Sequence, residues 1–499
     1  MRNIKNLEED VHTEFKKAKK GVPDDMWPTV SAFANTDGGS IFLGYTEIKK
    51  DGKAVGYKPT GVNDSAAMVK SILDTANNPR KLYPNVIYEN NIEIKQFKNN
   101  IEIVKVYIPK VPFKDRPVYI KGDIKNVFKR VGTGDRLAND SDIKAMLRDA
   151  AGDDSMETLD GFDISDLNLI DLQNYKAYYA DKNDDIEAVS MNNDEFLREI
   201  GLIRKDRKTN EFKLTRAALL LFGKYNSIQD EYPNFMLDLI VKHNPSDVDY
   251  IDRIYTSINK NSPNNIYSFF NQAYAKLQAL VENGFELNGI TREDNGTKFL
   301  RAIREALVNT LVHADYHSNQ SIQIIWFDNS IIFKNPGELL VSKDKFFDKT
   351  DSTPRNGLIF QIFVEAKLGE HTGSGGYRIL KTMQSLNLQI PDLKTSPQQT
   401  ELILWRITTE EVIKSLPMDW QKTYKVINEK LVVTFDELKS LYSSEWKGHK
   451  ILNDMIQKKL IVKIGKGRAT KYALSPDSPQ GKSIMNQYYD EMRRSIFED

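Results

Sequence analysis

Residues 31–44, Ser-Ala-Phe-Ala-Asn-Thr-Asp-Gly-Gly-Ser-Ile-Phe-Leu-Gly, decide the fold of the N-terminal part of this chain. Apolar residues from Trp27 to Phe33 recur at helical spacing, which predicts a helix that packs on a sheet. The paired glycines end that helix, because glycine accepts backbone angles with positive φ. A buried strand follows at 41–43, and Gly44 then allows a backbone or a ligand to approach closely.

Further strands are predicted on both sides of this stretch. Phe15 lies between acids and lysines, so the first strand is short and lies near a sheet edge, where charges discourage unwanted pairing. Residues 92–97 and 101–109 alternate apolar and polar residues, as antiparallel strands joined by a turn do. Two more strands are expected at 117–122 and 127–132, and a helix at 140–148.

The opening pattern resembles a known family. Glu-x4-Glu-Phe-Lys from Glu9, followed by the 31–44 stretch, resembles the Schlafen-type AlbA-like domain (AlbA_2) over roughly the first 130 residues. In nuclease-active Schlafens, two spaced glutamates and a third acid form a metal-dependent RNA-cutting site. The resemblance implies that Glu9, Glu14 and Glu47 are catalytic and hold the metal, although the family usually has Asp at the third place.

Three carboxylates that converge on one surface are suited to metal-dependent cleavage of RNA. Their hard oxygen atoms favour Mg²⁺ or Mn²⁺, and the metal then activates water. The alternative is that these acids are solvated surface charges.

Composition limits the classes of function. The 499 residues are enough for three or four domains, and the absence of cysteine excludes disulfides and thiolate chemistry. Lys plus Arg and Asp plus Glu are both 70, so a nucleic-acid surface must be a local patch. No N-terminal apolar run or spanning segment occurs, which leads us to expect a cytoplasmic protein without membrane contact.

A local basic group lies in the first 136 residues. Such a group suits a phosphate backbone, and the alternative is a solvated strand face. The residues expected to contact RNA or DNA here are Lys16, Lys114, Arg116, Lys121, Lys129 and Arg130.

A second informative pattern begins in the helix predicted at 299–316. Glu305 and Asn309 are four residues apart and share one helix face. Asn335-Pro336-Gly337 and the cluster Gly373-Ser374-Gly375-Gly376 follow in that order.

This order resembles the GHKL ATP-binding domain of gyrase, Hsp90, histidine kinases and MutL. It resembles more closely the RecG-related version in bacterial AlbA-like proteins, over about residues 290–410. The resemblance implies that Glu305 positions water, Asn309 ligates Mg²⁺ and the glycines wrap the phosphates of ATP. The implied nucleotide-binding residues are Glu305, Asn309, Asn335, Gly337, Gly373, Gly375 and Gly376.

One departure bears on this resemblance. Asn335-Pro336-Gly337 replaces the family's adenine-reading Asp-x-Gly-x-Gly, which puts ATP hydrolysis in question. A nucleotide-free structural or dimerisation domain is the alternative.

The C-terminal part predicts a winged helix. Three helical patterns between 420 and 459 precede two short strands, with Lys466 and Arg468 at the wing tip as nucleic-acid contacts. Such modules also contact proteins, and that use is the alternative. A terminal helix is expected at 481–499.

The resulting fold class is α+β and multidomain. The expected domains are an AlbA-like α/β domain (1–150), a middle helical module (156–289), a GHKL-like sandwich (290–412), a winged helix (416–478) and a C-terminal helix (479–499).

The expected function is metal-dependent cleavage of RNA, such as tRNA, in stress or phage defence, with a nucleotide-responsive domain and a homodimer. The alternatives are a non-catalytic, ATP-binding transcriptional regulator and an ATP-driven switch that contacts only proteins.

Overall fold

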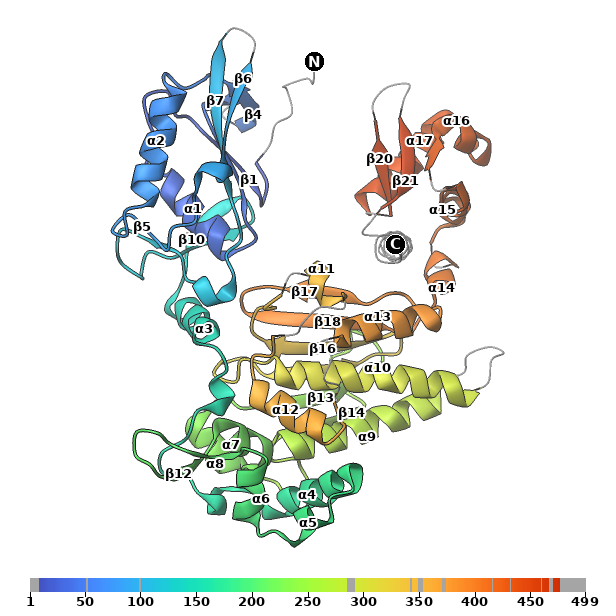
Figure 1. Cartoon of the computed structure of the whole chain (residues 1–499). Coiled ribbons are helices and arrows are strands. Elements are labelled where there is room, and N and C mark those ends of the chain that lie inside the picture. Colours follow the sequence, from blue (N-terminus) through green and yellow to red (C-terminus); the bar gives the residue numbers. More distant parts are fainter. Residues whose placement is uncertain are drawn as a thin grey trace, which may run out of the picture. The chain divides into compact units, whose positions relative to one another are not determined.

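The computed structural model divides the chain into two compact units, residues 1–154 and 155–499 (Figure 1). The residues it describes are 9–50, 53–97, 100–284, 292–341, 343–348, 353–369, 374–414, 416–430, 432–458, 460–465 and 470–475. Each unit has its own hydrophobic core.

A four-stranded sheet forms the centre of the first unit. Its strand order is β1 (Thr13–Lys16), β2 (Gly39–Leu43), β7 (Ile101–Ile108) and β6 (Ile92–Phe97). β1 runs parallel to β2, and the other neighbours are antiparallel. β1 lies at the edge, as its charged flanks predict, and the hairpin of β6 and β7 is also present.

Alternation along β2 distributes side chains to the two faces of this sheet. Ile41 and Leu43 join the main core, to which α1 (Met26–Asn35) and α2 (Ser65–Ala76) contribute. Phe42 lies on the opposite face, where Phe15 stacks on it with ring centroids 5.2 Å apart.

The hairpin of β3 (Tyr45–Lys50) and β4 (Lys53–Pro59) completes this second, aromatic cluster. Phe15 contacts Tyr45 and Tyr57 at centroid distances of 4.9 and 4.7 Å. Gly44 precedes the hairpin with φ of +99°, and a Cβ there would lie 3.1 Å from the backbone of Gly61. The close backbone approach predicted at Gly44 is therefore present.

Two polar residues of the 31–44 stretch have a structural role. The amide of Asn35 accepts from the N–H of Val118 at 2.8 Å and donates to its carbonyl at 2.7 Å. The Ser31 hydroxyl accepts from the N–H of Phe128 at 2.9 Å and donates to the Val118 carbonyl at 2.8 Å. These bonds fasten the segment around residues 118–128 to the C-terminal half of α1.

That segment contains both predicted strands, and each pairs with a different partner. β8 (Tyr119–Ile120) pairs with β5 (Leu82–Tyr83), and β9 (Phe128–Val131) pairs with β10 (Gly134–Leu137). Only an isolated bridge joins Tyr119 to Val127. Helix α3 (Asp140–Ala151) follows as predicted, and the boundary between the units comes three residues after it.

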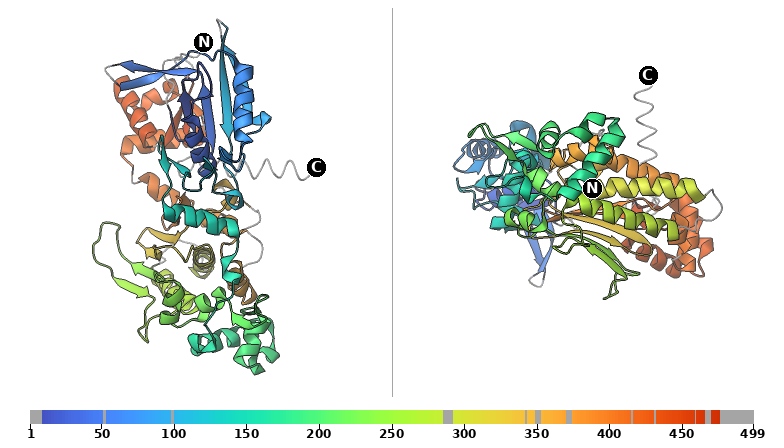
Figure 2. Two further views of the ribbon diagram at one scale, coloured as in Figure 1. Left: turned by 90° about the vertical axis from the view of Figure 1, so that its left-hand side faces the viewer. Right: turned by 90° about the horizontal axis from the view of Figure 1, so that it is seen from below.

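A six-stranded sheet organises the second unit. Its order is β14 (Asp252–Tyr255), β13 (Leu237–Val241), β15 (Ile322–Trp326), β16 (Ser330–Pro336), β18 (Gln399–Trp405) and β17 (Asp392–Thr395). β13 and β15 are parallel, and the long helices α9 (Ile266–Gly284) and α10 (Arg292–Val312) form the connection between them. Figure 2 shows these two helices side by side.

This pairing joins two regions that the sequence suggested as separate domains. The expected boundary at 289/290 falls between α9 and α10, yet both helices belong to one core. The parallel pairing of β13 with β15 bridges about 80 residues, a distance over which local patterns carry no information.

The remainder of the second unit is helical up to residue 231. These helices are α4 (Leu169–Asn183), α5 (Ile186–Ser190), α6 (Asn193–Glu199), α7 (Arg216–Phe222) and α8 (Tyr225–Glu231), with a small hairpin of β11 (Ile203–Lys205) and β12 (Phe212–Leu214). The apolar run of α7 is entirely buried, as core packing requires.

Residues 416–475, which we call the C-terminal module, have a core of their own. It contains α15 (Met418–Lys430), α16 (Phe435–Leu438), α17 (Glu445–Gln457) and a sheet of order β19 (Val432–Thr434), β21 (Lys471–Leu474), β20 (Ile461–Ile464). The predicted wing residues Lys466 and Arg468, and the predicted helix at 481–499, lie outside the described residues.

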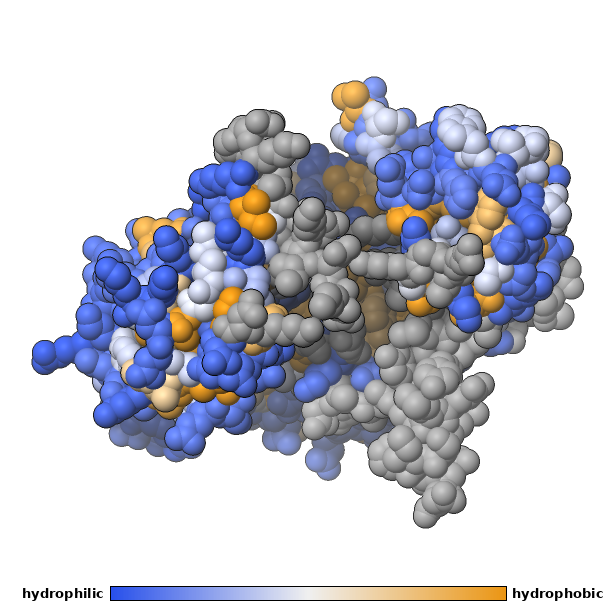
Figure 3. All heavy atoms as spheres, turned by 90° about the horizontal axis from the view of Figure 1, so that it is seen from above, coloured by the Kyte–Doolittle hydropathy of each residue, from blue (hydrophilic) through white to orange (hydrophobic). Residues whose placement is uncertain are grey.

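The surface drawn in Figure 3 is mostly hydrophilic where it is coloured, with hydrophobic residues scattered among the polar ones. No helix in the described ranges is long and apolar enough to cross a membrane.

Candidate functional site

Glu14 of the predicted catalytic set is held inside the first unit by two cations. Its Oε2 lies 2.9 Å from Nη2 of Arg130, and its Oε1 lies 2.8 Å from Nζ of Lys16. Only 10% of the side chain is exposed. Strand alternation explains this position, because Glu14 and Phe15 must point to opposite faces of β1.

Arg130 is the centre of this network. Its Nη1 lies 2.8 Å from Asp135, and its Nη2 donates to the carbonyl of Asp10 at 3.0 Å. The guanidinium also stacks on Phe33, 4.9 Å from the ring centroid. Every one of these contacts stabilises the folded unit, so Arg130 is a structural residue here.

Glu9 occupies the open edge of β1. Its Oε1 accepts a hydrogen bond from the N–H of Phe15 at 3.0 Å, which satisfies a donor that no neighbouring strand reaches. The hydroxyl of Tyr57 also bonds this carboxyl, and burial raises the pKa of Glu9, with the Phe15 N–H acting in the opposite direction. Burial likewise raises the pKa of Tyr57, reinforced by the negative charge of Glu9.

Glu47 stands opposite Tyr57 in the β3–β4 ladder. It is exposed and pairs with Lys49 at 3.1 Å. Each of the three predicted acids therefore has its own partner, and Glu14 lies on the opposite face of β1 from the aromatic cluster.

The ligand set predicted for Mg²⁺ or Mn²⁺ does not fit this arrangement. Within the described ranges, no three Asp, Glu or His side chains lie close enough together to hold a metal ion. The physical reason is that Glu14 faces α1 and is neutralised by Arg130 and Lys16, whereas Glu9 and Glu47 lie near Tyr57.

Four of the six basic residues expected to contact nucleic acid in this unit have internal partners. Lys16 pairs with Glu14 and with Asp25 at 3.1 Å, and Lys129 pairs with Asp142 at 2.5 Å. Arg116 is buried and donates through Nε to the carbonyl of Val111 at 3.2 Å.

Arg130 is the fourth, and only Lys114 and Lys121 of the six are exposed. Of these six residues, Lys114 and Lys121 remain accessible, because internal partners hold the other four against the body of the unit.

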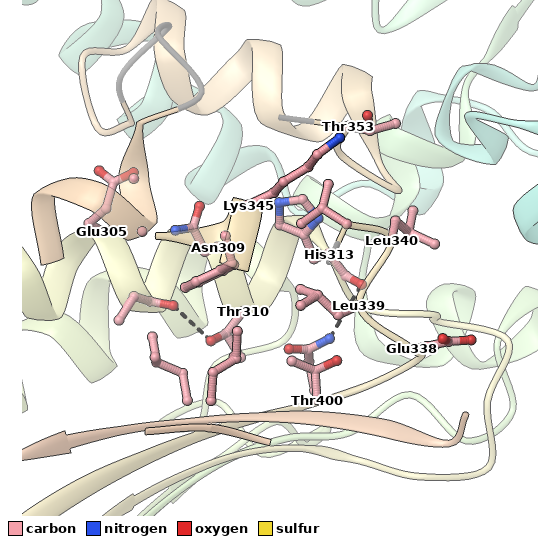
Figure 4. A pocket seen from close by; sticks show the side chains of 18 of the residues that line it. Glu305, Asn309, Thr310, His313, Glu338, Leu339, Leu340, Lys345, Thr353 and Thr400 are labelled. Carbon is pink, nitrogen blue, oxygen red and sulfur yellow. Dashed lines mark hydrogen bonds between the residues drawn. The ribbon is translucent and has the colours of Figure 1, made fainter. Parts of the chain in front are cut away.

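The second unit contains a pocket where the predicted nucleotide residues meet (Figure 4). Glu305 and Asn309, one turn apart on α10, line it together with the first residues of α13 (Gly375–Ser385). The predicted residues in its wall are Glu305, Asn309, Asn335, Gly375 and Gly376. Gly373 lies outside the described residues.

The start of α13 is packed so tightly that it requires glycine. A Cβ on Gly375 would lie 2.2 Å from Oε1 of Glu305 and 2.8 Å from Nδ2 of Asn309. A Cβ on Gly376 would lie 2.0 Å from the carbonyl oxygen of Phe346, at the end of α11 (Lys343–Phe346). The glycine cluster therefore brings the helix start against the two polar residues of α10.

The opposite end of the pocket is formed by β16 and β18. Nδ2 of Asn335 donates to the carbonyls of Pro336 at 3.1 Å and His313 at 3.3 Å. Thr400 also lines the pocket, and its hydroxyl donates to the carbonyl of Gly337 at 3.0 Å.

Gly337 itself lies behind the pocket wall. Its φ is +101°, and a Cβ would meet the guanidinium of Arg355 at 2.5 Å. Arg355 in turn donates to the carbonyls of His313 and Glu338 at 2.5 and 3.0 Å. The glycine therefore shapes the wall and allows Arg355 to brace it.

Two titratable groups in the pocket are perturbed. Burial raises the pKa of Glu305, while the charges of Arg378 and Arg304 act against this shift. Burial, with the nearby Arg355, lowers the pKa of His313 to about 4, so this imidazole is neutral at pH 7.

Several pocket residues were not identified from the sequence. Lys345, Thr353 and Thr400 line the pocket, but no motif marks them. Thr400 was detectable in principle as an inward position of the alternating strand β18. The short helix that carries Lys345 gives no periodic signal.

Comparison with family models defines the class of protein. Residues 9–139 match "Schlafen, AlbA_2", and residues 319–404 match "Putative ATP-dependent DNA helicase recG C-terminal" (HATPase_c_4). Residues 144–238 match "Domain of unknown function (DUF8451)". The chain is thus an AlbA_2 protein that carries a RecG-related ATPase-like domain, which confirms both resemblances.

Solved structures give more distant likenesses. The crystal structure of the DIP2311 protein from Corynebacterium diphtheriae is 16% identical, covers 93% of this chain and 92% of its own, and has a TM-score of 0.40. The solution structure of the N-terminal domain of a putative ATP-dependent DNA helicase RecG-related protein from Nitrosomonas europaea is 24% identical.

The second likeness covers 25% of this chain and 82% of the other, with a TM-score of 0.20. Scores this low define neither the fold nor the function of this chain. The comparison with curated proteins gives no match.

Proposed function

We propose that this protein binds an adenine nucleotide in the pocket of the second unit and nucleic acid through its AlbA_2 domain. The observation that carries the proposal is the meeting of Glu305, Asn309 and Gly375 at one end of a pocket whose other end holds Asn335 and Thr400. We propose for this domain the GHKL-like sandwich implied by the resemblance.

The α13 end of the pocket suits phosphate groups. The first N–H groups of a helix lack intrahelical partners and favour anions, and α13 begins in the pocket wall at Gly375. Lys345 adds a positive charge to this wall. The amide oxygen of Asn309 is a hard ligand of the kind that Mg²⁺ takes alongside phosphates.

The Asn335 end suits adenine despite the departure from the family pattern. Because Nδ2 donates to two main-chain carbonyls, the polar atom that remains for a ligand is the acceptor Oδ1. The exocyclic amino group of adenine is a donor and matches that acceptor. A keto oxygen at the same place, as in guanine, would face another acceptor.

Titration calorimetry of the full chain tests this proposal. ATP with Mg²⁺ should bind and GTP should bind more weakly. Asn335→Leu should abolish binding, because it removes the acceptor Oδ1. Binding that is absent for ATP and ADP at millimolar concentration, or that survives Asn335→Leu, overturns the proposal.

The descriptions of both matched families point to nucleic acids, which supports a nucleic-acid-related function. RNA cleavage by Glu9, Glu14 and Glu47 stays a prediction. It is favoured by one observation, that two of these acids lie at Tyr57: the Tyr57 hydroxyl bonds Glu9, and Glu47 stands opposite Tyr57 in the β3–β4 ladder. The internal pairing of Glu14 opposes it, and we therefore propose binding without cleavage by these acids as the primary function.

Incubation with tRNA and Mn²⁺ separates binding from cleavage. Glu47→Gln is the informative variant, because Glu47 is exposed and its replacement leaves the Arg130 network intact. Cleavage by the wild type that is lost in Glu47→Gln would restore the nuclease hypothesis. Retention of intact tRNA in a gel shift agrees with the proposal.

A further inference from the structure

Helix α17 of the C-terminal module has two distinct faces. Ile451, Leu452 and Met455 point into the module's core. Four exposed residues recur at positions i, i+4, i+7 and i+11, which places them along one stripe of the helix, beside the exposed Glu445 and His449. This stripe consists of Trp446, Lys450, Asn453 and Gln457.

The stripe is rigidly supported. The Ser444 hydroxyl accepts from the N–H of Lys447 at 3.2 Å and fixes the start of the helix. Next to the stripe, His449 stacks on Phe435 with ring centroids 4.0 Å apart and an interplanar angle of 8°. Asn453 and Gln457 have no hydrogen-bond partner within the described part of the chain, so their amides are available to a ligand.

The residue types on the stripe match base edges. Asn and Gln can bond adenine through two atoms at once, and Lys can bond the O6 and N7 acceptors of guanine. The ring of Trp446 is 71% exposed, with the Lys450 amine 5.4 Å from its centroid. An exposed apolar ring beside these polar groups suits contact with a thymine methyl group or a sugar.

The excess of positive charge in the C-terminal module favours the binding of a polyanion. Residues 416–475 contain twelve Lys and Arg against six Asp and Glu, within a chain whose formal net charge is zero. A local excess of this kind is the electrostatic signature of nucleic-acid binding. An exposed α-helix also fits the width of the major groove of duplex DNA.

We propose that α17 reads base edges in the major groove of duplex DNA through Lys450, Asn453 and Gln457. This site is separate from the nucleotide pocket and from the AlbA_2 domain. It would give the protein a preference for particular DNA sequences, in addition to any binding through phosphate contacts.

Selection of the full chain against a pool of random DNA duplexes tests this proposal. An enriched sequence is expected. Fluorescence anisotropy at about 150 mM salt then compares the enriched duplex with a scrambled one, because affinities depend steeply on salt. The double variant Asn453→Ala Gln457→Ala should reduce the ratio of the two affinities by roughly tenfold or more, at 1–3 kcal/mol per bidentate pair.

The matched control is Lys425→Ala Glu429→Ala, which removes an exposed pair on α15 of the same module. It should leave the ratio unchanged, and circular dichroism should show both variants folded. The proposal is overturned if no sequence is enriched, if the α17 variant keeps the ratio, or if the control loses it equally. None of these outcomes affects the tests of nucleotide binding or of the AlbA_2 domain.

Discussion

At the scale of single residues, the charges buried around Arg130 decide how the first unit is held together. The carboxylates of Glu14 and Asp135 are 10% and 14% exposed and both bond one guanidinium, with Lys16 as the second cation on Glu14. Removal of one partner from such a group leaves charges that are neither solvated nor paired, and this costs more than the pair contributes when intact.

We therefore expect Arg130→Met to lower the free energy of unfolding of the first unit by about 3–5 kcal/mol. Arg136→Met is the matched control, because Arg136 is exposed on the neighbouring strand β10. Urea denaturation of the full chain measures both. Equal stability of the two variants would show that the network contributes little.

The neutral His313 gives the second unit a pH dependence of defined sign. Its pKa of about 4 lies below the ordinary value near 6.5, so the unfolded chain binds the proton more tightly. The corresponding stability is fully present above pH 6.5 and is lost as the pH falls towards 4.

We expect His313→Gln to reduce this loss. The measurement is the difference in melting temperature between wild type and variant at several pH values from 7 to 4. Parallel curves for the two proteins would contradict the assignment.

At the scale of elements, the junction of α10 and α13 builds the nucleotide pocket. A methyl group on Gly375 would overlap Glu305, so we expect Gly375→Ala to weaken ATP binding and to destabilise the second unit by about 1–3 kcal/mol. Calorimetry and thermal melting measure the two effects.

Gly296→Ala is the control, and it should change stability in the opposite direction. Gly296 lies within α10, and a Cβ there meets no atom within 4 Å. Alanine in an open helix position should stabilise the chain by roughly 0.5–1 kcal/mol. If Gly375→Ala and Gly296→Ala change stability by the same amount, the close approach of position 375 to Glu305 is not the reason that glycine is required there.

The elements also show how far the sequence could predict the structure. β1, α1, β2, β6, β7 and α3 follow from local periodicity and turn chemistry, and α10 brings Glu305 and Asn309 to one face as their spacing requires. Pairings between distant segments were not predictable. Nothing local marks Arg130 as the partner of Glu14, or β13 as the neighbour of β15.

The arrangement of the predicted acidic residues was not predictable for the same reason. The spacing of Glu9 and Glu14 specifies neither which face of β1 Glu14 takes nor which cations pair with it. The nucleotide pocket was easier to predict, since most of its predicted polar residues come from two motifs on adjoining elements.

At the scale of the whole molecule, the two compact units should unfold separately. Each has its own core, and two cores of this kind need not share one cooperative transition. We expect two calorimetric transitions, of which Arg130→Met shifts only one. A single transition displaced as a whole would show strong coupling between the units.

The predicted homodimer belongs to this scale as well. The AlbA_2 family model matches this chain once, over residues 9–139, so two such domains in one assembly require two chains. We expect light scattering coupled to gel filtration to give about twice the chain mass of 57.2 kDa. A mass of one chain across the accessible concentrations would reject the dimer.

The bond between Glu14 and Arg130 spans 116 residues of sequence, and this span affects how the protein is made. At a translation rate of about 5–20 residues per second, Glu14 leaves the peptidyl-transferase centre roughly 6–23 s before its partner exists. Throughout that interval Glu14 lacks one of its two cations, and the last two strands of the first unit are incomplete. Folding of this domain therefore requires that translation has passed residue 130. Fragments that end earlier are unsuitable for studying its folding. We expect chaperones to bind such fragments.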